Sequence, residues 1–178
     1  MNSDNIFMGV GSYASHPKLH RYNDLSCKVI IGNFCSLAED IEFIPGGSHQ
    51  IDRATTFPIR RVLGLSGFEQ DDCKSPNDVL VGNDVWICRG VKIIGDITIG
   101  DGAVLAAYSV VNKDVPPYAI VAGNPAVVKK FRFSQDIIES LINIAWWNWP
   151  IEQVIERVDD LMSADIEKFI NKYKNKDI

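Results

Sequence analysis

The hydrophobic residues in the middle of the chain recur at every sixth position. A helix needs apolar spacings of three and four, and a single strand needs a spacing of two, so neither element alone produces this period. A six-residue period is typical of a solenoid of short parallel strands, in which equivalent residues of successive coils point inward and stack. Counted from Val81, the first positions are Val81, Ile87, Ile93, Ile99, Leu105 and Val111, and the fifth positions are Val85, Val91, Ile97, Ala103, Ser109 and Val115.

The same pattern occurs before residue 44, and a looser copy, "VGSYAS", begins at Val10. We therefore predict earlier coils, in which Cys35 is a small core residue. The earlier first positions are Ile31, Leu37 and Phe43, and the fifth positions are Cys35 and Ile41. Several residues that follow a first position are small or turn-prone, which suits a corner of the coil. These residues are Gly82, Gly100, Ala106 and Asn112.

The six-residue pattern is interrupted between residues 44 and 77. Long unpatterned segments in compact domains are commonly functional, so this inserted loop is a candidate site. The loop contains His49 shortly after Gly46 and Gly47, which would allow a sharp turn. We predict a β-solenoid over residues 1–130 with loop 44–77 inserted, followed by a helical extension over residues 131–178.

The extension shows apolar residues at helical spacing. We expect Ser134 to cap a first helix, a second helix to begin near Pro150, and a third near Ala164. Tryptophans in the "WWNWP" segment between the helices are expected to pack the helices against the solenoid rather than to stack on a ligand. The expected apolar residues are Ile137, Ile138, Leu141 and Ile142, then Ile151, Val154, Ile155, Val158, Leu161 and Met162, then Ile166, Phe169, Ile170 and Tyr173.

Composition narrows the class of protein. The net charge of -5 argues against nucleic acid as the main partner, and no apolar run approaches the ~18 residues of a membrane span. The start of the sequence lacks the pattern of a signal peptide, and none of the four cysteines has CxxC spacing. We therefore expect a cytoplasmic protein with free thiols and no membrane insertion.

Several motifs together resemble the hexapeptide-repeat acyltransferases, and most closely their xenobiotic acetyltransferase branch. The matching stretches are "IGNFCSLAEDIEFIPGGSHQIDRATTFPI", "VGNDVWICRGVKIIGDITIGDGAV", "KDVPPYAIVAGNPAVVKKFRFS" and "WWNWP". This branch includes chloramphenicol and streptogramin O-acetyltransferases and relatives from polysaccharide gene clusters. The resemblance implies a left-handed parallel β-helix and a homotrimer with active sites between neighbouring subunits.

The resemblance also implies chemistry. The family moves an acyl group from coenzyme A to an acceptor hydroxyl, and its catalytic histidine matches His49. An imidazole can take the hydroxyl proton as the oxygen attacks the thioester. Asp52 is considered as an orienting partner for the ring, and a backbone carbonyl is the alternative.

The expected cofactor is acetyl-CoA, bound along the last coils of the solenoid. A basic cluster near the end of the solenoid would meet its phosphates, and small residues would admit its pantetheine arm. The candidate cofactor-binding residues are Trp86, Ala106, Ala107, Lys113, Ala122, Gly123, Pro125, Lys129, Lys130 and Arg132. The chain departs from the family pattern at Ser48, Cys88 and Tyr108, which leaves the size of the acceptor and the shape of the channel open.

A metal site is not expected. His16 and His20 have the i,i+4 spacing of helical metal ligands, but Pro17 lies between them and no carboxylate is near in sequence.

The first hypothesis for function is transfer of an acetyl group to a sugar hydroxyl of a cell-surface polysaccharide or its precursor. The alternatives are a chloramphenicol or streptogramin acetyltransferase, an amino-sugar N-acetyltransferase, and a catalytically idle binding module.

Overall fold

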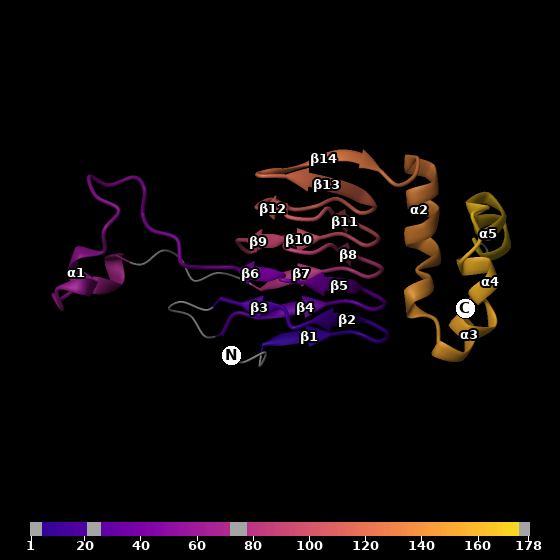
Figure 1. The fold of residues 1–178 in the computed structure, drawn as a ribbon, viewed down its shortest axis with the longest axis horizontal. Helices are drawn as coiled ribbons and strands as arrows, with labels where there is room; N and C mark the ends of the chain where they lie inside the picture. Colours follow the sequence, from indigo (N-terminus) through magenta and orange to yellow (C-terminus); the bar gives the residue numbers. More distant parts are fainter. Residues whose placement is uncertain (1–4, 21–25, 72–77, 175–178) are drawn as a thin grey trace.

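The computed structural model describes residues 5–20, 26–71 and 78–174, and its centre is a parallel β-helix (Figure 1). The chain visits three sheets in turn, so the predicted solenoid is confirmed. Sheet A contains β1 (Ile6–Met8), β4 (Val29–Ile31), β7 (Val79–Val81) and β10 (Thr98–Ile99). Sheet B contains β2 (Tyr13–Ser15), β5 (Ser36–Glu39), β8 (Trp86–Ile87), β11 (Val104–Leu105), β13 (Ala119–Gly123) and β14 (Ala126–Phe131). Sheet C contains β3 (Lys18–Leu19), β6 (Glu42–Ile44), β9 (Lys92–Ile94) and β12 (Val110–Val111).

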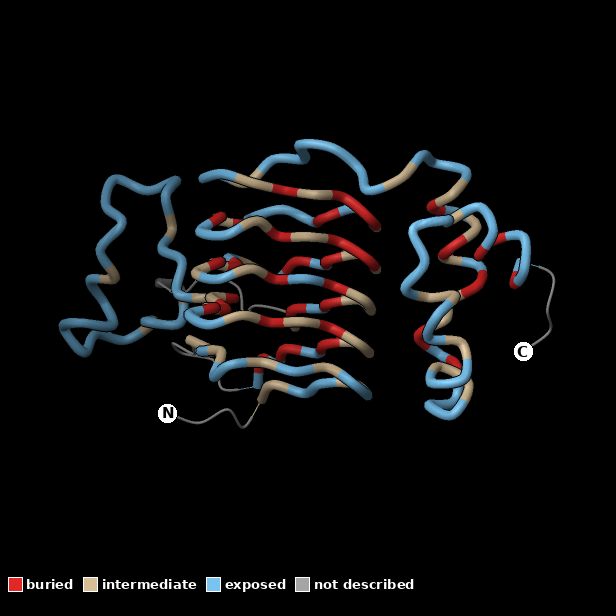
Figure 2. Tube along the Cα trace, turned by 45° about the vertical axis from the view of Figure 1, so that its right-hand side comes forward, coloured by how far each residue is buried: buried red, intermediate tan, exposed pale blue. Residues whose placement is uncertain are grey.

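The core of the solenoid is built from the two predicted columns. Every first-position and fifth-position residue from Ile31 onward is buried, and the buried residues line the inside of the coils in Figure 2. Cys35 lies in this core, as predicted. Ser109 is the one polar member of the columns, and its hydroxyl oxygen accepts a hydrogen bond of 3.2 Å from the Gly123 backbone N–H. Its burial is therefore compensated.

A ladder of side chains holds the corner between sheets A and B. The Oδ1 atom of Asn33 accepts from the backbone N–H of Val10, and Oδ1 of Asn83 accepts from the N–H of Asn33, both at 2.8 Å. The residue before each ladder member must be small, because a Cβ atom on Gly32 would lie 2.5 Å from Asn83 Oδ1. This contact explains why glycine follows the first position at this corner.

The outer faces of the three sheets differ. On sheet A, Phe7, Ile30 and Leu80 lie in register and are all exposed, which gives an apolar stripe. On sheet C, Lys92 Nζ lies 2.8 Å from a Glu42 carboxylate oxygen, so that face carries paired charges. Sheet B presents a row of aromatic and hydroxyl side chains, described below as part of the site.

The helical extension packs at the corner between sheets A and B (Figure 1). It consists of α2 (Gln135–Ile144), η2 (Trp146–Asn148), α3 (Ile151–Glu156), α4 (Val158–Leu161) and α5 (Ile166–Tyr173). The amide of Asn33 donates to the Trp147 carbonyl oxygen at 3.1 Å, and the rings of Phe34 and Trp146 lie 4.9 Å apart. The predicted packing role of these tryptophans is confirmed. Within the described ranges, every helix is too short or too polar to cross a membrane.

The first and third helices agree with the sequence prediction, but the second does not. Ser134 precedes α2 as expected, and α5 buries Phe169, Ile170 and Tyr173. The predicted second helix is broken at Arg157 into α3 and α4. The Arg157 guanidinium lies over the ring of Trp149 at 4.6 Å, a contact that holds this residue inward at the break. Four residues of the predicted apolar stripe are consequently exposed: Ile151, Ile155, Val158 and Met162.

The interrupted segment forms an arm that stands off the solenoid. The arm comprises residues 45–71 and includes α1 (Ile59–Val62) and η1 (Phe68–Asp71). It leaves after β6, on the side of the solenoid opposite the helical extension (Figures 1 and 2). Much of its apolar surface is in water, and Ile51 has 86% of its surface exposed. The other exposed apolar residues of the arm are Phe57, Ile59, Val62, Leu63, Leu65 and Phe68.

Two neighbouring isoleucines of β9 provide a test of the inward column. Ile93 is fully buried, whereas Ile94 is 38% exposed. We expect Ile93→Ala to lower the free energy of unfolding by about 2–5 kcal/mol, because it leaves a cavity between coils. Ile94→Ala should cost no more than about 1 kcal/mol, because its side chain is already partly in water. Urea unfolding at equal protein concentration measures both, and equal losses would contradict the assigned register.

Candidate active site

His49 lies on the arm, and one of its ring nitrogens is held by the backbone. The Nδ1 atom lies 2.7 Å from the carbonyl oxygen of Thr56. A carbonyl oxygen only accepts hydrogen bonds, so Nδ1 carries the proton in this contact. In the neutral ring the lone pair is then on Nε2, which is the arrangement that a general base requires. Gly47, with φ of 82°, provides the turn that precedes the histidine.

The ring is therefore oriented by a carbonyl, the alternative that the sequence left open beside Asp52. In the part of the chain that the structure describes, no contact joins Asp52 to the imidazole. The two partners differ in spacing, since Thr56 is seven residues from His49 and Asp52 is three. Thr56 and His49 lie on opposite sides of the loop, and this hydrogen bond joins the two sides.

A shallow groove of about 280 Å³ crosses the outer face of sheet B. Tyr13, Ser36 and Trp86 lie in register on β2, β5 and β8 and form its floor. The two aromatic side chains are largely exposed, at 63% for Tyr13 and 54% for Trp86. The groove thus combines ring faces with hydroxyl groups, and the residues that line it are Tyr13, Ser15, Ser36, Leu37, Ala38, Glu39, Trp86 and Arg89.

One rim of the groove is charged. Arg89 lies 3.4 Å from a Glu39 carboxylate oxygen and 3.1 Å from one of Asp40. Asp40 raises the pKa of the exposed Arg89 guanidinium by accepting its hydrogen bond. Sequence analysis identified Trp86 but missed Tyr13, Ser36 and Arg89. A signal was present for the first two, because Tyr13, Ser36 and Trp86 each precede the inward residue of their strand.

Within one chain the groove and His49 do not share a pocket. The groove is lined only by residues of β2, β5 and β8 and the turns that follow them. The arm has a separate small pocket of its own, lined by residues 50–60. A single copy therefore keeps the base and the groove apart.

Ala106, one of the two alanines predicted to admit pantetheine, lies in a column of small residues. The backbone N–H of Cys88 donates to Leu105, and that of Ala106 donates to Val121, so Cys88, Ala106 and Ala122 occupy equivalent positions of successive coils. Ala106 and Ala122 are partly exposed and Ala107 is fully so. Burial raises the pKa of the Cys88 thiol, which favours its neutral form.

Tyr108 departs from the family pattern and left the shape of this channel open, and the structure shows where its ring lies. Its ring lies against the backbone of Gly90 in the preceding coil, where any Cβ atom would collide with it. Gly90 has φ of 71°, and Tyr108 itself has φ of 59°. The pair is thus a matched corner contact in which glycine makes room for the ring.

The predicted turn "AGNPA" is present, between β13 and β14. Gly123 has φ of 111°, and the Asn124–Pro125 peptide bond is cis. The antiparallel hairpin places Lys129 and Lys130 on β14 with exposed side chains. Lys113 is also exposed, but it lies in the turn after β12, between sheets C and A. Lys113 therefore lies on a different element from the other two lysines.

Arg132, predicted to meet the cofactor phosphates, also makes contacts inside the chain. Its Nη1 atom donates to Asp84 at 3.0 Å and to the Gly102 carbonyl oxygen at 2.8 Å, and its guanidinium lies over the rings of Tyr118 and Phe133. Burial raises the pKa of the Asp84 carboxyl, and Arg132 opposes this rise. Because the pair joins residues 48 positions apart, no local sequence signal indicated it.

The histidines of "HPKLH", His16 and His20, lie on the first coil of the solenoid. His20 Nε2 lies 3.2 Å from a Glu42 carboxylate oxygen on sheet C. In residues 5–20, 26–71 and 78–174, no group of three or more His, Cys, Asp or Glu is placed to hold a metal ion.

Comparison with known proteins gives a consistent match. A family model described as bacterial transferase hexapeptide (six repeats) matches residues 78–113. The chain is 41% identical over 165 residues to a protein from Lysinibacillus sphaericus named probable macrolide acetyltransferase, covering 89% of this chain and 91% of that protein. It is 40% identical over 152 residues to a chloramphenicol acetyltransferase from Morganella morganii, covering 83% and 72% respectively.

A solved structure of galactoside acetyltransferase in complex with coenzyme A matches with a TM-score of 0.57 and 28% identity, covering 75% of this chain and 58% of that chain. The sequence matches extend well beyond residues 78–113, the part that the family model matches. The fold is a left-handed parallel β-helix, and the chain belongs to the hexapeptide-repeat acetyltransferases, which makes it an acyltransferase that uses acetyl-CoA.

Proposed function

We propose that the protein is an O-acetyltransferase in which His49 of one copy is the general base at the groove of a neighbouring copy. The observation that carries this proposal is the 2.7 Å contact between His49 Nδ1 and the Thr56 carbonyl oxygen. It fixes the tautomer that leaves Nε2 able to accept a proton. The base is also displayed on an arm that projects from its own solenoid (Figure 1).

The reaction follows from this arrangement. Acetyl-CoA supplies the acetyl group as a thioester. An acceptor hydroxyl gives its proton to Nε2 of His49 while its oxygen forms a bond to the acetyl carbon. The carbon–sulfur bond breaks, and the proton on Nε2 passes to the departing coenzyme A sulfur. The Thr56 carbonyl holds the ring in place during both proton transfers, and no covalent link to the protein is required.

Two apolar surfaces support a homotrimer. The stripe of Phe7, Ile30 and Leu80 on sheet A and the apolar side of the arm are both exposed in a single chain. Contiguous exposed apolar surface is typical of an interaction site. Most soluble homo-oligomers close by cyclic symmetry, and a threefold ring would let each arm reach the next copy. The interface would bury the arm and complete three identical sites.

The groove favours a sugar as acceptor. The exposed rings of Tyr13 and Trp86 offer flat apolar faces, and Ser15, Ser36 and Glu39 offer hydroxyl and carboxylate groups. A sugar presents an apolar ring face and a rim of hydroxyl groups, which match these two kinds of contact. We therefore place a hydroxyl of a cell-surface polysaccharide, or of its precursor, first among the acceptors.

An antibiotic hydroxyl is the second candidate, and the relatives favour it. The names of the sequence relatives reported above refer to macrolide and chloramphenicol acetylation. The same base and groove would serve an apolar acceptor, with the rings of Tyr13 and Trp86 as the main contacts.

A panel of acceptors separates these candidates. The purified protein is given acetyl-CoA with free sugars, sugar nucleotides, chloramphenicol, a macrolide or a streptogramin, and release of the coenzyme A thiol is followed. We expect turnover with sugars that is at least about tenfold above that with the antibiotics in kcat/KM, a modest discrimination for polar recognition. The reverse order would assign the protein to the antibiotic acetyltransferases.

Substitution of His49 and Asp52 tests the assignment of the base. We expect His49→Gln to lower kcat by about 10²–10⁴-fold, the usual contribution of a general base. Asp52→Asn should change kcat by less than about threefold, because the carbonyl of Thr56 orients the ring in place of this carboxylate. Steady-state kinetics with a saturating donor measure both variants. A large loss in Asp52→Asn would restore the carboxylate as the orienting group.

Mixed oligomers test whether the site is shared between copies. His49→Gln and Trp86→Ala are each expected to be poorly active when purified alone. Unfolded together in equal amounts and refolded, they should recover activity, because random pairing leaves about one quarter of the shared sites with both native residues. Mixing the two folded proteins without subunit exchange is the control. Absence of recovery after refolding would place His49 and Trp86 in the same copy.

A further inference from the structure

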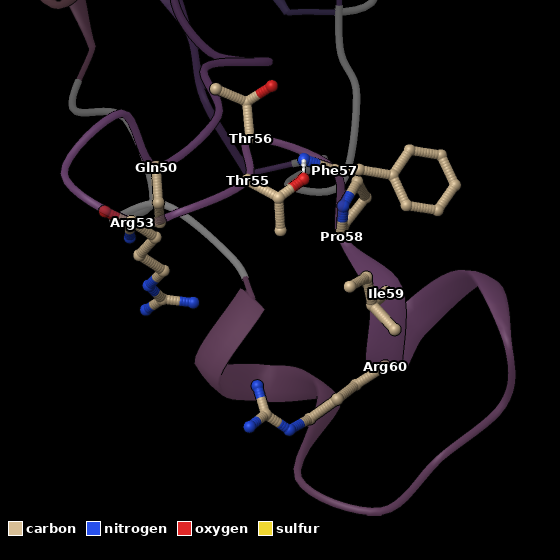
Figure 3. A pocket seen from close by; sticks show the side chains of 8 residues that line it. All are labelled: Gln50, Arg53, Thr55, Thr56, Phe57, Pro58, Ile59 and Arg60. Carbon is tan, nitrogen blue, oxygen red and sulfur yellow. Dashed lines mark hydrogen bonds between the residues drawn. The ribbon is translucent and has the colours of Figure 1, made fainter.

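The arm carries a second pocket directly beside the catalytic base (Figure 3). The pocket is small, about 80 Å³, and lies between the two sides of the loop. Its lining begins with Gln50, the residue after His49, and includes Thr56, whose carbonyl oxygen holds the His49 ring. The lining residues are Gln50, Arg53, Thr55, Thr56, Phe57, Pro58, Ile59 and Arg60.

The charge of this pocket is opposite to that of the chain. The protein has a net charge of -5, yet the charged residues that line the pocket are two arginines, Arg53 and Arg60. Figure 3 shows the two side chains coming from different parts of the loop, and both line this pocket. Among the residues that the structure describes, the pocket lining thus carries two cations and no carboxylate.

The neighbouring Arg61 offers a comparison within the same helix. Its guanidinium lies 5.1 Å from the centre of the Phe68 ring, and the residue is not part of the pocket lining. Arg60 and Arg61 thus have the same charge and adjacent positions but face different surroundings.

The chemistry of the lining suits an anion with several oxygen atoms. A guanidinium presents paired N–H donors that match a carboxylate or a phosphate. The hydroxyls of Thr55 and Thr56 and the amide of Gln50 can donate further hydrogen bonds. Both arginines also make contacts elsewhere in the chain, and five N–H donors allow a guanidinium to serve more than one acceptor.

We propose that this pocket binds an anionic group of the acceptor, a carboxylate or a phosphate ester, and so places a nearby hydroxyl at His49. The inference rests on the proposed function, because it names the class of acceptor that the same site would use. It makes the acceptor an acidic or phosphorylated sugar rather than a neutral one. Arg53 and Arg60 are then residues that determine specificity, and the proton is still taken by His49.

Matched acceptors test the charge directly. Galacturonate is compared with galactose, and glucose 6-phosphate with glucose, by the kcat/KM for each at saturating acetyl-CoA. We expect each acidic acceptor to exceed its neutral partner by about 10- to 100-fold, the range for hydrogen bonds to charged groups. Arg53→Gln and Arg60→Gln should remove most of this advantage, so that the acidic and neutral acceptors are used about equally. Arg61→Gln is the matched control and should retain it.

The coenzyme A phosphates are the other possible anion, and the donor distinguishes them. Each variant is assayed with acetyl-CoA and with S-acetylpantetheine, which lacks the nucleotide phosphates. If the pocket serves the acceptor, the loss in Arg60→Gln persists with both donors. A loss confined to the KM of acetyl-CoA, and absent with S-acetylpantetheine, would overturn the proposal in favour of the donor.

Binding without turnover separates this inference from the proposed function. Calorimetry of the wild-type protein with glucose 6-phosphate, in the absence of any donor, should show binding that Arg53→Gln and Arg60→Gln weaken about tenfold or more. Such binding without acetylation of any acceptor would reject the transferase mechanism but retain the anion pocket. Equal use of acidic and neutral acceptors, or an equal loss in Arg61→Gln, would reject the pocket and retain the mechanism.

Discussion

The structure depends on the stacking of two inward columns of aliphatic side chains along the axis of the solenoid. Residues such as Ile87, Ile93 and Ile99 are completely buried, and each packs in a coil whose neighbours present equivalent residues. Two of every six positions supply the buried apolar area, so side chains at the other positions need not pack in the core. A stiff scaffold with free outer positions results, and the functional groups occupy those positions.

The same constraint explains why chemistry is placed on an arm. A coil of this kind repeats its geometry, so its outer face presents side chains in straight rows such as Tyr13, Ser36 and Trp86. A row can form a groove, but its side chains all leave the sheet in the same direction. A base that must approach bound substrate from the opposite side has to come from elsewhere. The arm carries His49 outside the rows, and in the proposed trimer a neighbouring copy would cover its apolar surface.

The sequence was a good guide where the determinant was local or periodic. The hexad columns identified the coils because each inward residue is fixed by its distance from the next. Ser134 marked the start of α2 by its position, although its hydroxyl donates to Asp136 and makes no capping hydrogen bond to the helix backbone. The sequence was a poor guide where the determinant joined distant residues. The contact of Arg132 with Asp84 was not predicted, because the two residues are 48 positions apart and meet only after the chain has folded.

The second helix and the groove show two further limits. The stripe of Ile155 and Met162 has helical spacing, but spacing alone does not tell whether another element covers it, and the break at Arg157 leaves both residues exposed. The groove residues are separated by more than 20 positions and come together through strand register. Alignment of the six-residue repeats predicts that register, so the groove residues could have been identified from the sequence.

The choice of a carbonyl to hold His49 has a consequence for the charges around the base. A carboxylate partner would add a negative charge beside the ring, and it would weaken the attraction of the arm for an anionic acceptor. The Thr56 carbonyl fixes the same tautomer without a net charge. The group that holds the imidazole therefore adds no negative charge near the positive charges of Arg53 and Arg60. An arm that orients its base with a neutral group can direct that base and attract a negatively charged substrate at the same time.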